Sequence, residues 1–402
     1  MKEKDYAYSP RRHFWRNGVC MSVILWAARL IVRTEDYQYE PFHPQEKTFL
    51  LVANHNDKLD PIYEMVHLGR YIRYVASDHV VRSGILGKLI NFFATPIVKH
   101  RDRPSSELVQ NIQDTLKNGV CVGLHAEGGM SVNGESRYIS PNTGKLIKDA
   151  DCDVITYRMV GGYLRSPRWA VKKRKGPLRG GVVHTYTREE LRQMTEEEIY
   201  QAVCRDLYVN AYEEQRKNPQ RYVGENLAEN CETVLYECPK CHGVATLRSM
   251  GNFLFCDCGY KVELQEDGFF HDCGAGLIYD NIRDWDHWQK TAIRSYIDGF
   301  SRNFTDPIFM DDRQIVRRVE GNEKKQVSEA GTVALYYDRL EIHWPGTDLV
   351  YAIGDVEKLD YVSRQSLLIV TGDCYLDLES AYPRSPQKYI EAWRYLTHRP
   401  SY

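Results

Sequence analysis

One segment of the sequence places a histidine and a carboxylate where they could transfer a proton. The apolar run Thr48–Ala53 continues directly into N-H-N-D-K-L-D, residues 54–60. His55 is a candidate general base, and a carboxylate at Asp60 that accepts its Nδ1–H would fix the tautomer, leave Nε2 free and stabilise the imidazolium. Five residues are too many for one face of a helix, so the pair requires an irregular turn. Taken alone, such a spacing is more often structural.

Two further apolar runs end in residues of related chemistry. Glu127-Gly128-Gly129 follows the run at 120–124, and the basic segment K-H-R-D-R, residues 99–103, follows Ile97-Val98. Carboxyl ends of parallel strands meet at one edge of a sheet, and glycines let a substrate approach the backbone closely. We therefore expect a site for an anionic substrate that bears a hydroxyl group. The alternative is three solvated loops.

Short apolar runs alternate with amphipathic segments through the first half of the chain. The pattern predicts helices over 84–93 and 105–117, and a longer helix from the capping box Thr195–Glu198 to about residue 217. It predicts strands over 48–53, 71–76, 97–98, 120–124 and 154–159. Such alternation is typical of an α/β sheet with helices on its faces.

Three ordered blocks in this region resemble the glycerolipid acyltransferases, of which the lysophosphatidic acid acyltransferases are the best-known members. The blocks are N-H-x-x-x-x-D at 54–60, T-P-I-V-K-H-R at 95–101 and E-G-G at 127–129, and the resemblance covers about residues 10–225. It implies transfer of a fatty acyl group from an acyl-CoA or acyl carrier protein thioester to the hydroxyl of a lysophospholipid such as lysophosphatidic acid, in phospholipid biosynthesis.

The resemblance also implies roles for individual residues. His55 would be the general base and Asp60 would orient it, as the catalytic pair. Arg101 would contact a phosphate. Glu127 and Gly128 would take part in acceptor binding, and Asn54 and Gly129 are further expected substrate-binding residues.

Some positions depart from the family pattern. The third block reads H-A-E-G-G-M-S at 125–131, where the family commonly has F-P-E-G-T-R-S, so the phosphate contact of that arginine has no counterpart here. Thr95 replaces a usual glycine, and Ile155 replaces the usual proline of a fourth block. The sequence contains no G-x-S-x-G, P-loop or G-x-G-x-x-G motif, which favours direct attack by the acceptor over a covalent serine mechanism.

Two close cysteine pairs follow the first domain. The segments C-P-K-C at 238–241 and C-D-C-G at 256–259 predict a zinc ribbon with Cys238, Cys241, Cys256 and Cys258 as ligands. Cys231, His271 and Cys273 are near enough in sequence to replace one of them. Four thiolates would fill the coordination shell, so the zinc would be structural.

These features predict three domains. An acyltransferase domain over 1–230 would be followed by the zinc ribbon at 231–265 and a small β-rich domain at 266–402, which weakly resembles pleckstrin-homology-like or GRAM-like modules. Strands are expected at 351–353, 367–371 and 375–378, and a closing helix at 385–396. Such modules bind lipids or proteins, and a purely supporting role is the alternative.

Composition and charge limit the class of protein. The 402 residues include 43% hydrophobic and 27% charged residues, which is ordinary for a globular protein, and the mean hydropathy of −0.52 argues against a multi-pass membrane protein. Residues 1–230 carry a net charge of +6 and residues 231–402 a net charge of −8. We expect anionic partners for the first half. The polar N-terminus and the 11 cysteines without a secretory signal favour a reducing, cytoplasmic location.

Two segments suggest attachment to an anionic membrane surface. The apolar run at 19–28 is too short to span a bilayer, but Arg11, Arg12 and Arg16 precede it. Trp15 before the run and Trp26 within it would be interfacial anchors. The run would lie in the membrane surface or form a buried first helix. The second segment, residues 165–179, contains seven basic residues, no acidic ones and Trp169.

Three hypotheses follow from the sequence. The leading one is a peripheral membrane acyltransferase. The first rival is an adaptor for lipid or protein that keeps the acyltransferase fold without activity, which the altered third block allows. The second rival is a zinc-ribbon protein that binds nucleic acid, although residues 236–262 are not basic enough to favour it. We therefore expect no nucleic-acid partner.

Overall fold

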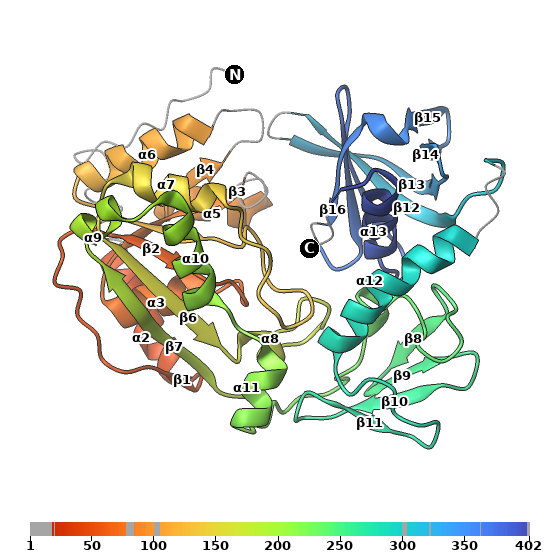
Figure 1. The fold of residues 1–402 in the computed structure, drawn as a ribbon, viewed down its shortest axis with the longest axis horizontal. Coiled ribbons are helices and arrows are strands. Elements are labelled where there is room, and N and C mark those ends of the chain that lie inside the picture. The colour runs from red at the N-terminus through yellow and green to blue at the C-terminus, as the bar shows by residue number, and fades with distance from the viewer. Residues whose placement is uncertain are drawn as a thin grey trace. The chain divides into compact units, whose positions relative to one another are not determined.

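The computed structural model describes residues 18–19, 21–77, 84–99, 105–299, 304–320, 323–361 and 363–399. The chain forms two compact units, coloured along the sequence in Figure 1. Unit 1 comprises residues 1–131, 135–166 and 175–220, and unit 2 comprises residues 132–134, 167–174 and 221–402. Unit 1 is mixed α/β and unit 2 is rich in β-strands. The domain boundaries expected at 230 and 265 stay predictions.

Unit 1 is built on a seven-stranded sheet with the order β1-β7-β6-β2-β5-β3-β4. Its central strand, β2, is parallel to both of its neighbours, whereas β7 runs antiparallel to β6. The parallel strands are short and apolar because helices cover both of their faces. The strands are β1 (Tyr37–Gln38), β2 (Leu50–Ala53), β3 (Ile72–Ser77), β4 (Ile97–Lys99), β5 (Cys121–His125), β6 (Val154–Val160) and β7 (Leu178–Tyr186).

Alternate residues of β2 belong to two separate hydrophobic cores. Leu51 and Ala53 pack into the core that contains α2 and α3, and Leu50 and Val52 pack into the core that contains α6, α7 and α10. The helices of unit 1 are α2 (Met21–Arg33), α3 (Asp60–Leu68), α5 (Gly84–Phe93), α6 (Ser105–Lys117), α7 (Asn142–Ala150), α8 (Gly162–Arg165), α9 (Arg188–Gln193), α10 (Glu196–Leu207) and α11 (Ala211–Lys217).

The single helix predicted from Thr195 to residue 217 is wrong, because the structure has two helices there. Thr195 and Glu198 form the predicted capping box at the start of α10. The helix ends at Leu207, and Asn210 then caps α11 by accepting the backbone N–H groups of Tyr212 and Glu213. An asparagine side chain that bonds to the backbone in this way favours a new helix start over continuation of the preceding helix.

Unit 2 contains two antiparallel sheets. The four-stranded sheet has the order β11-β10-β9-β8 and the seven-stranded sheet has the order β15-β14-β13-β12-β18-β17-β16. The expected closing helix is α13 (Gln387–Leu396), which packs with α12 (Ile282–Gly299) against the larger sheet. The strands are β8 (Leu247–Met250), β9 (Phe253–Cys256), β10 (Lys261–Leu264), β11 (Phe270–Asp272), β12 (Phe309–Glu320), β13 (Glu323–Leu335), β14 (Arg339–Trp344), β15 (Thr347–Ala352), β16 (Val356–Tyr361), β17 (Ser366–Thr371) and β18 (Tyr375–Ser380), with short 3₁₀ turns η2 (Cys231–Thr233) and η3 (Ile353–Asp355).

Candidate active site

Two asparagines tie the loop after β2 to the neighbouring strand β6. The completely buried Asn54 accepts the backbone N–H of Met159 over 2.7 Å and donates from Nδ2 to the Met159 carbonyl over 2.9 Å. Asn56 donates to the same carbonyl over 3.2 Å. Asn54 therefore fixes the backbone immediately before His55, and the substrate contact expected for it stays a prediction.

Asp60 is the first residue of α3 and is completely buried. Its Oδ2 lies 3.0 Å from Nδ1 of His55 and also accepts the backbone N–H groups of Asn56 and Asp57, over 2.7 and 2.9 Å. The irregular turn between β2 and α3 thus brings the imidazole back over the start of the helix. An ionised carboxylate only accepts hydrogen bonds, so His55 donates from Nδ1 and its Nε2 is the nitrogen available to a substrate.

The surroundings of His55 favour its neutral form. Its side chain is 20% exposed, and burial lowers the pKa of the imidazole from its ordinary value. A second histidine, His125, lowers the pKa further, whereas the bond to Asp60 acts in the opposite direction. A neutral imidazole with an oriented Nδ1–H can accept a proton from a hydroxyl group at Nε2.

Glu127, in the turn after β5, joins the His55 loop to a later segment. One carboxylate oxygen accepts the backbone N–H of His55 over 3.3 Å, and the other accepts the backbone N–H of Arg137 over 2.7 Å. The residue is 7% exposed, and burial raises the pKa of its carboxyl group to about 7, against the lowering effect of these two bonds. The structure thus brings Glu127 beside His55, at the edge where β2 and β5 end.

A second histidine–carboxylate pair lies against the first. The rings of His55 and His125 are stacked, with centroids 4.2 Å apart and an angle of 6° between the planes. Nε2 of His125 lies 3.1 Å from Oε1 of the completely buried Glu64, whose other oxygen accepts the hydroxyl of Tyr74. Burial lowers the pKa of His125, but Glu64, together with Asp60 and Glu127, raises it above its ordinary value.

Atoms of His55, Asp60 and His125 lie within 4.8 Å of one another, a separation that would also suit a metal ion. The two rings are parallel, however, and a ring nitrogen of each already faces its own carboxylate. Hydrogen bonding within two adjacent pairs therefore accounts for the cluster.

The glycines of the third block form a tight turn. Gly128 has a φ of +66° and donates its N–H to the carbonyl of His125 over 3.1 Å, a conformation that disfavours any residue with a side chain. A Cβ atom on Gly129 would collide with the guanidinium group of Arg137. This cation lowers the pKa of the nearby Glu127 carboxyl group, although burial dominates there.

The third predicted strand end is only partly described. β4 is parallel to β3 and ends at Lys99, so its carboxyl end lies at the same edge of the sheet as those of β2 and β5. Arg101, predicted to contact a phosphate, lies outside the described residues, as do His100, Asp102 and Arg103.

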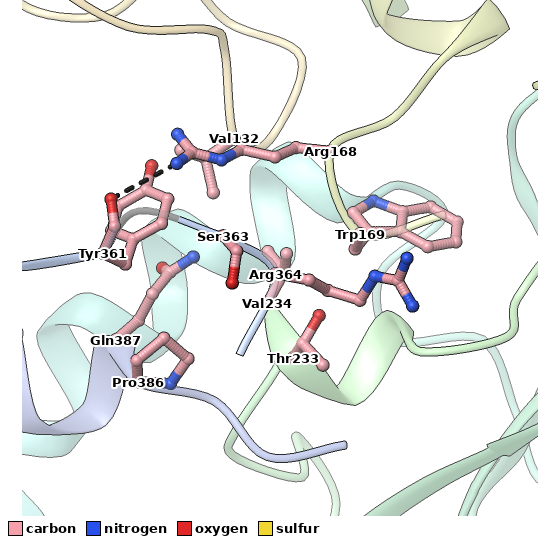
Figure 2. A pocket seen from close by; sticks show the side chains of 10 residues that line it. All are labelled: Val132, Arg168, Trp169, Thr233, Val234, Tyr361, Ser363, Arg364, Pro386 and Gln387. Atoms are coloured by element: carbon pink, nitrogen blue, oxygen red, sulfur yellow. Dashed lines mark hydrogen bonds between the residues drawn. The ribbon is translucent and has the colours of Figure 1, made fainter. Parts of the chain in front are cut away.

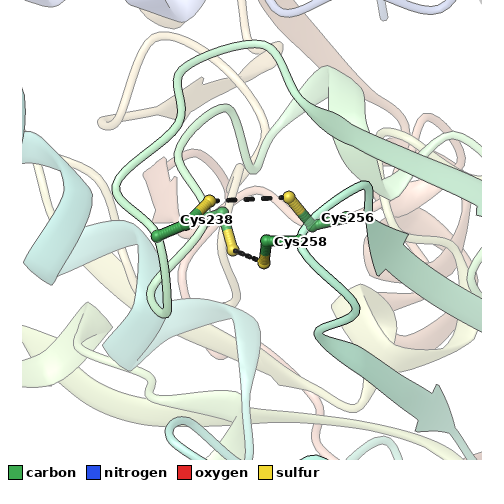
Figure 3. A group of neighbouring side chains, drawn as sticks. Cys238, Cys256 and Cys258 are labelled. Atoms are coloured by element: carbon green, nitrogen blue, oxygen red, sulfur yellow. Dashed lines mark hydrogen bonds between the residues drawn. The ribbon is translucent and has the colours of Figure 1, made fainter.

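The four cysteines predicted as ligands converge in unit 2 (Figure 3). Sγ of Cys238 lies 3.8 Å from Sγ of Cys258, and Sγ of Cys241 lies 3.7 Å from Sγ of Cys256. Four sulfurs at the usual Zn–S distance of about 2.3 Å, placed at the corners of a tetrahedron, would be about 3.8 Å apart. The group can therefore hold a tetrahedral metal ion. Cys231, His271 and Cys273 are not members of this cluster within the described part of the chain.

Unit 2 also contains a small pocket (Figure 2). The guanidinium carbon of Arg168 lies 4.1 Å from the centre of the Tyr361 ring, and Nη2 donates to the Tyr361 carbonyl over 3.3 Å. None of the residues predicted to act in catalysis or metal binding lines it. The lining residues are Val132, Arg168, Trp169, Thr233, Val234, Tyr361, Ser363, Arg364, Pro386 and Gln387.

The basic segment at 165–179 is less available to lipid than the sequence suggested. Arg165 and Arg174 are buried, the first paired with Glu35 and the second donating to the Leu227 carbonyl. Trp169 is 1% exposed, so it is not an interfacial anchor. Some of the basic side chains of this segment are therefore engaged in cation–π and hydrogen-bond contacts within the fold. The exposed basic residues of the segment are Lys172, Lys173 and Lys175.

Comparison with known proteins bears on this site. Residues 31–160, which contain His55, Asp60 and Glu127, match the family model described as Acyltransferase. This segment is similar to acyltransferase domains. The match confirms the resemblance to the glycerolipid acyltransferases for the N-terminal part of the chain, and it supports an acyltransferase activity.

The other comparisons add less. Solved structures similar to this chain include the 1-acyl-sn-glycerophosphate (LPA) acyltransferase PlsC from Thermotoga maritima, at 14% identity and a TM-score of 0.38, covering 49% of this chain and 91% of that one. No curated protein matches the chain.

The sequence reasoning missed three residues around the candidate site. Glu64 lies one helical turn after Asp60, a spacing that places both carboxylates on one face of α3 and was readable in advance. His125 is paired in register with Ala53, because β5 lies beside β2. That neighbour relationship depends on sheet order, which the sequence did not supply. Arg137 reaches the turn from a loop, without any motif.

Proposed function

We propose that the protein transfers a fatty acyl group from an acyl-CoA or acyl carrier protein thioester to a hydroxyl group of a lysophospholipid such as lysophosphatidic acid. The observation that carries the proposal is the His55–Asp60 pair at the carboxyl end of β2, with Glu127 beside it, inside a segment that is similar to acyltransferase domains. The neutral imidazole and its buried carboxylate match what attack by a hydroxyl group requires.

The proposed reaction is a direct displacement. Nε2 of His55 takes the hydroxyl proton while the acceptor oxygen bonds to the thioester carbonyl carbon. Asp60, 3.0 Å from Nδ1, stabilises the imidazolium that forms. The C–S bond then breaks, and the imidazolium returns its proton to the departing thiolate. The products are an ester and a free thiol, and His55 is again neutral.

A cation near the turn at 127–129, Arg137, supports an anionic headgroup on the acceptor. Asp60, Glu64 and Glu127 are all carboxyl groups, so a phosphate needs a cation to approach the site. Arg137 places its guanidinium group against Gly129, in the block whose usual arginine is missing. Arg101 stays a predicted second phosphate contact.

Attachment to a membrane surface is supported by the two apolar faces of α2. Met21, Leu25, Ala28 and Val32 are buried in the core of unit 1. A second stripe at the same helical spacing is exposed, and Trp26 within it is 63% exposed. Among the described residues, no helix is long and apolar enough to cross a bilayer. We propose that the exposed stripe of α2, Val23, Trp26 and Leu30, lies in the lipid interface together with Val19, which precedes the helix.

We also propose that the cysteine cluster holds one structural zinc ion. The sulfur separations of 3.7 and 3.8 Å agree with tetrahedral thiolate coordination, and the cluster is attached to the four-stranded sheet that includes β9. Zinc would link the two cysteine loops and supply no step of acyl transfer. The pleckstrin-homology-like or GRAM-like role of the larger sheet and the cytoplasmic location stay predictions.

An acceptor panel tests the activity. The purified protein is incubated with an acyl-CoA and, separately, an acyl carrier protein thioester, each with lysophosphatidic acid, an uncharged monoacylglycerol or no acceptor, and free thiol is measured. We expect thiol release that depends on the acceptor and is greatest with the phosphate-bearing lipid. Lipid binding without acceptor-dependent thiol release would support the adaptor instead.

A further inference from the structure

The second histidine of the site, His125, is 10% exposed and packs against an ionic partner. Glu64 is completely buried in α3, and a buried carboxylate is costly unless it is hydrogen-bonded and paired with a positive charge. In the described structure, the ion pair formed by Glu64 is with Nε2 of His125, at 3.1 Å. The hydroxyl of Tyr74 donates to its other oxygen.

The local backbone is shaped to hold this arrangement. Tyr74 of β3 is in register with Gly123 of β5, and a Cβ atom at Gly123 would collide with the Tyr74 ring. The absence of a side chain lets the ring lie across β5 and stack at 5.4 Å on His125. His125 is thus held between Tyr74 on one side and His55 on the other.

The stack brings the charge of one histidine to the proton-accepting ring of the other. We propose that His125 is a positioning residue that Glu64 holds as an imidazolium, and that its charge keeps the stacked His55 neutral and able to accept a proton. The ring centroids are 4.2 Å apart, so a second positive charge on His55 would be repelled. Without His125, burial alone would oppose Asp60, which raises the pKa of His55 and so favours the protonated form that cannot act as a base.

Other titratable groups surround the two rings, and their effects follow from the same contacts. Glu127 and Asp60 are carboxyl groups that raise the pKa of His125. Tyr74 has a pKa well above its ordinary value because of burial, so it remains a neutral donor to Glu64. The charged and titratable groups around the pair are Asp60 and Glu64 from α3, Tyr74 from β3, Tyr157 from β6, and Glu127 and Arg137 from the segment after β5.

The inference rests on the proposed function, because a neutral His55 matters when that residue accepts a proton. Its test does not require acyl transfer to be detected. Histidine ring signals are followed by NMR against pH in protein labelled at histidine, for the wild type, His125→Phe and a control, His343→Phe. Phenylalanine keeps a flat ring in the stack and removes the charge. His343 lies in unit 2, paired with Asp348 and Glu341.

We expect His125→Phe to raise the pKa of His55 by about 1 unit or more, the usual effect of one nearby charge, and His343→Phe to leave it unchanged. The acidic limb of the kcat/KM profile should move to higher pH by the same amount. Glu64→Gln should lower the pKa of His125 itself. If His125→Phe fails to fold because Glu64 is left unpaired, the double variant His125→Phe/Glu64→Gln removes both charges. It should still raise the pKa of His55, but by less, because Glu64 itself raises that pKa and His125 has the larger effect.

Two results would overturn the inference: a neutral His125 in the wild type at pH 6, or an unchanged His55 titration in a folded His125→Phe protein. Failure of the proposed function is a separate outcome, because the ring titrations would then shift as expected while no acyl transfer is detected with any acceptor.

Discussion

Replacing Asp60 by asparagine keeps the shape of the side chain and removes its charge. The amide oxygen can still accept the N–H groups of Asn56 and Asp57, which lie 2.7 and 2.9 Å from Oδ2 in the wild type. It can no longer offer a negative charge to the His55 imidazolium formed during proton transfer. The loss should therefore fall on the transition state more than on substrate binding.

The size of the effect follows from the geometry. A carboxylate 3.0 Å from Nδ1 lies about 4 Å from the centre of the imidazolium charge, and two unit charges at that separation interact by about 4 kcal/mol at an effective dielectric constant of about 20. At about 1.4 kcal/mol per factor of ten, kcat should fall about 10³-fold. KM should change much less.

A double-mutant cycle makes this prediction specific. The rates of thiol release are compared for the wild type, Asp60→Asn, His55→Ala and the double variant, with Asp57→Asn as the control. Asp57 is also buried in this loop, but its side chain accepts the N–H of Leu59. The double variant should be scarcely slower than His55→Ala, because Asp60 acts through the histidine. Multiplied losses, or an equal loss in Asp57→Asn, would refute this reasoning.

Three other predictions test different parts of the molecule. Protein purified without chelators should contain one zinc ion by elemental analysis, lost in Cys238→Ser and kept in Cys273→Ser; a metal-free wild type would contradict the zinc site. Trp26→Ser should weaken binding to anionic vesicles, and salt should weaken it further, whereas the similarly exposed control Met250→Ser should bind as the wild type does. Equal partitioning of the wild type onto neutral and anionic vesicles would contradict an electrostatic contribution to membrane binding. The raised pKa of Glu127 means that the folded protein favours its protonated form, so the stability it gives is present below pH 4.5 and lost as the pH rises through about 7. From pH 5 to 8, Glu127→Gln should therefore gain stability relative to the wild type, by up to about 3 kcal/mol in urea unfolding; a constant difference would refute this.

The sequence predicted those parts of the site that depend on local pattern. Buried parallel strands appear in a sequence as short apolar runs, so the strand before His55 was recognisable. The five-residue spacing to Asp60 already required the irregular turn that is observed. The cysteine pairs were equally readable, because metal ligands recur at close spacing.

Other features depend on which strands become neighbours. The stacking of His55 on His125 arises because β5 lies beside β2, although the two strands are about 70 residues apart in sequence. The end of α10 at Leu207 depends on Asn210 capping the next helix, a local competition that hydrophobic periodicity does not reveal. The burial of Trp169 and Arg174 likewise depends on contacts with distant segments, so a basic run alone was a poor guide to exposed charge.

The central claim is that His55 removes the proton from the acceptor hydroxyl. The most direct test compares acceptor-dependent thiol release by the wild type and His55→Ala, with an acyl thioester and lysophosphatidic acid, after circular dichroism has shown that both proteins are folded. A positioned base contributes about 10²–10⁴-fold, so turnover should fall by that factor while the fold is retained. Full activity in a folded His55→Ala protein would contradict the mechanism.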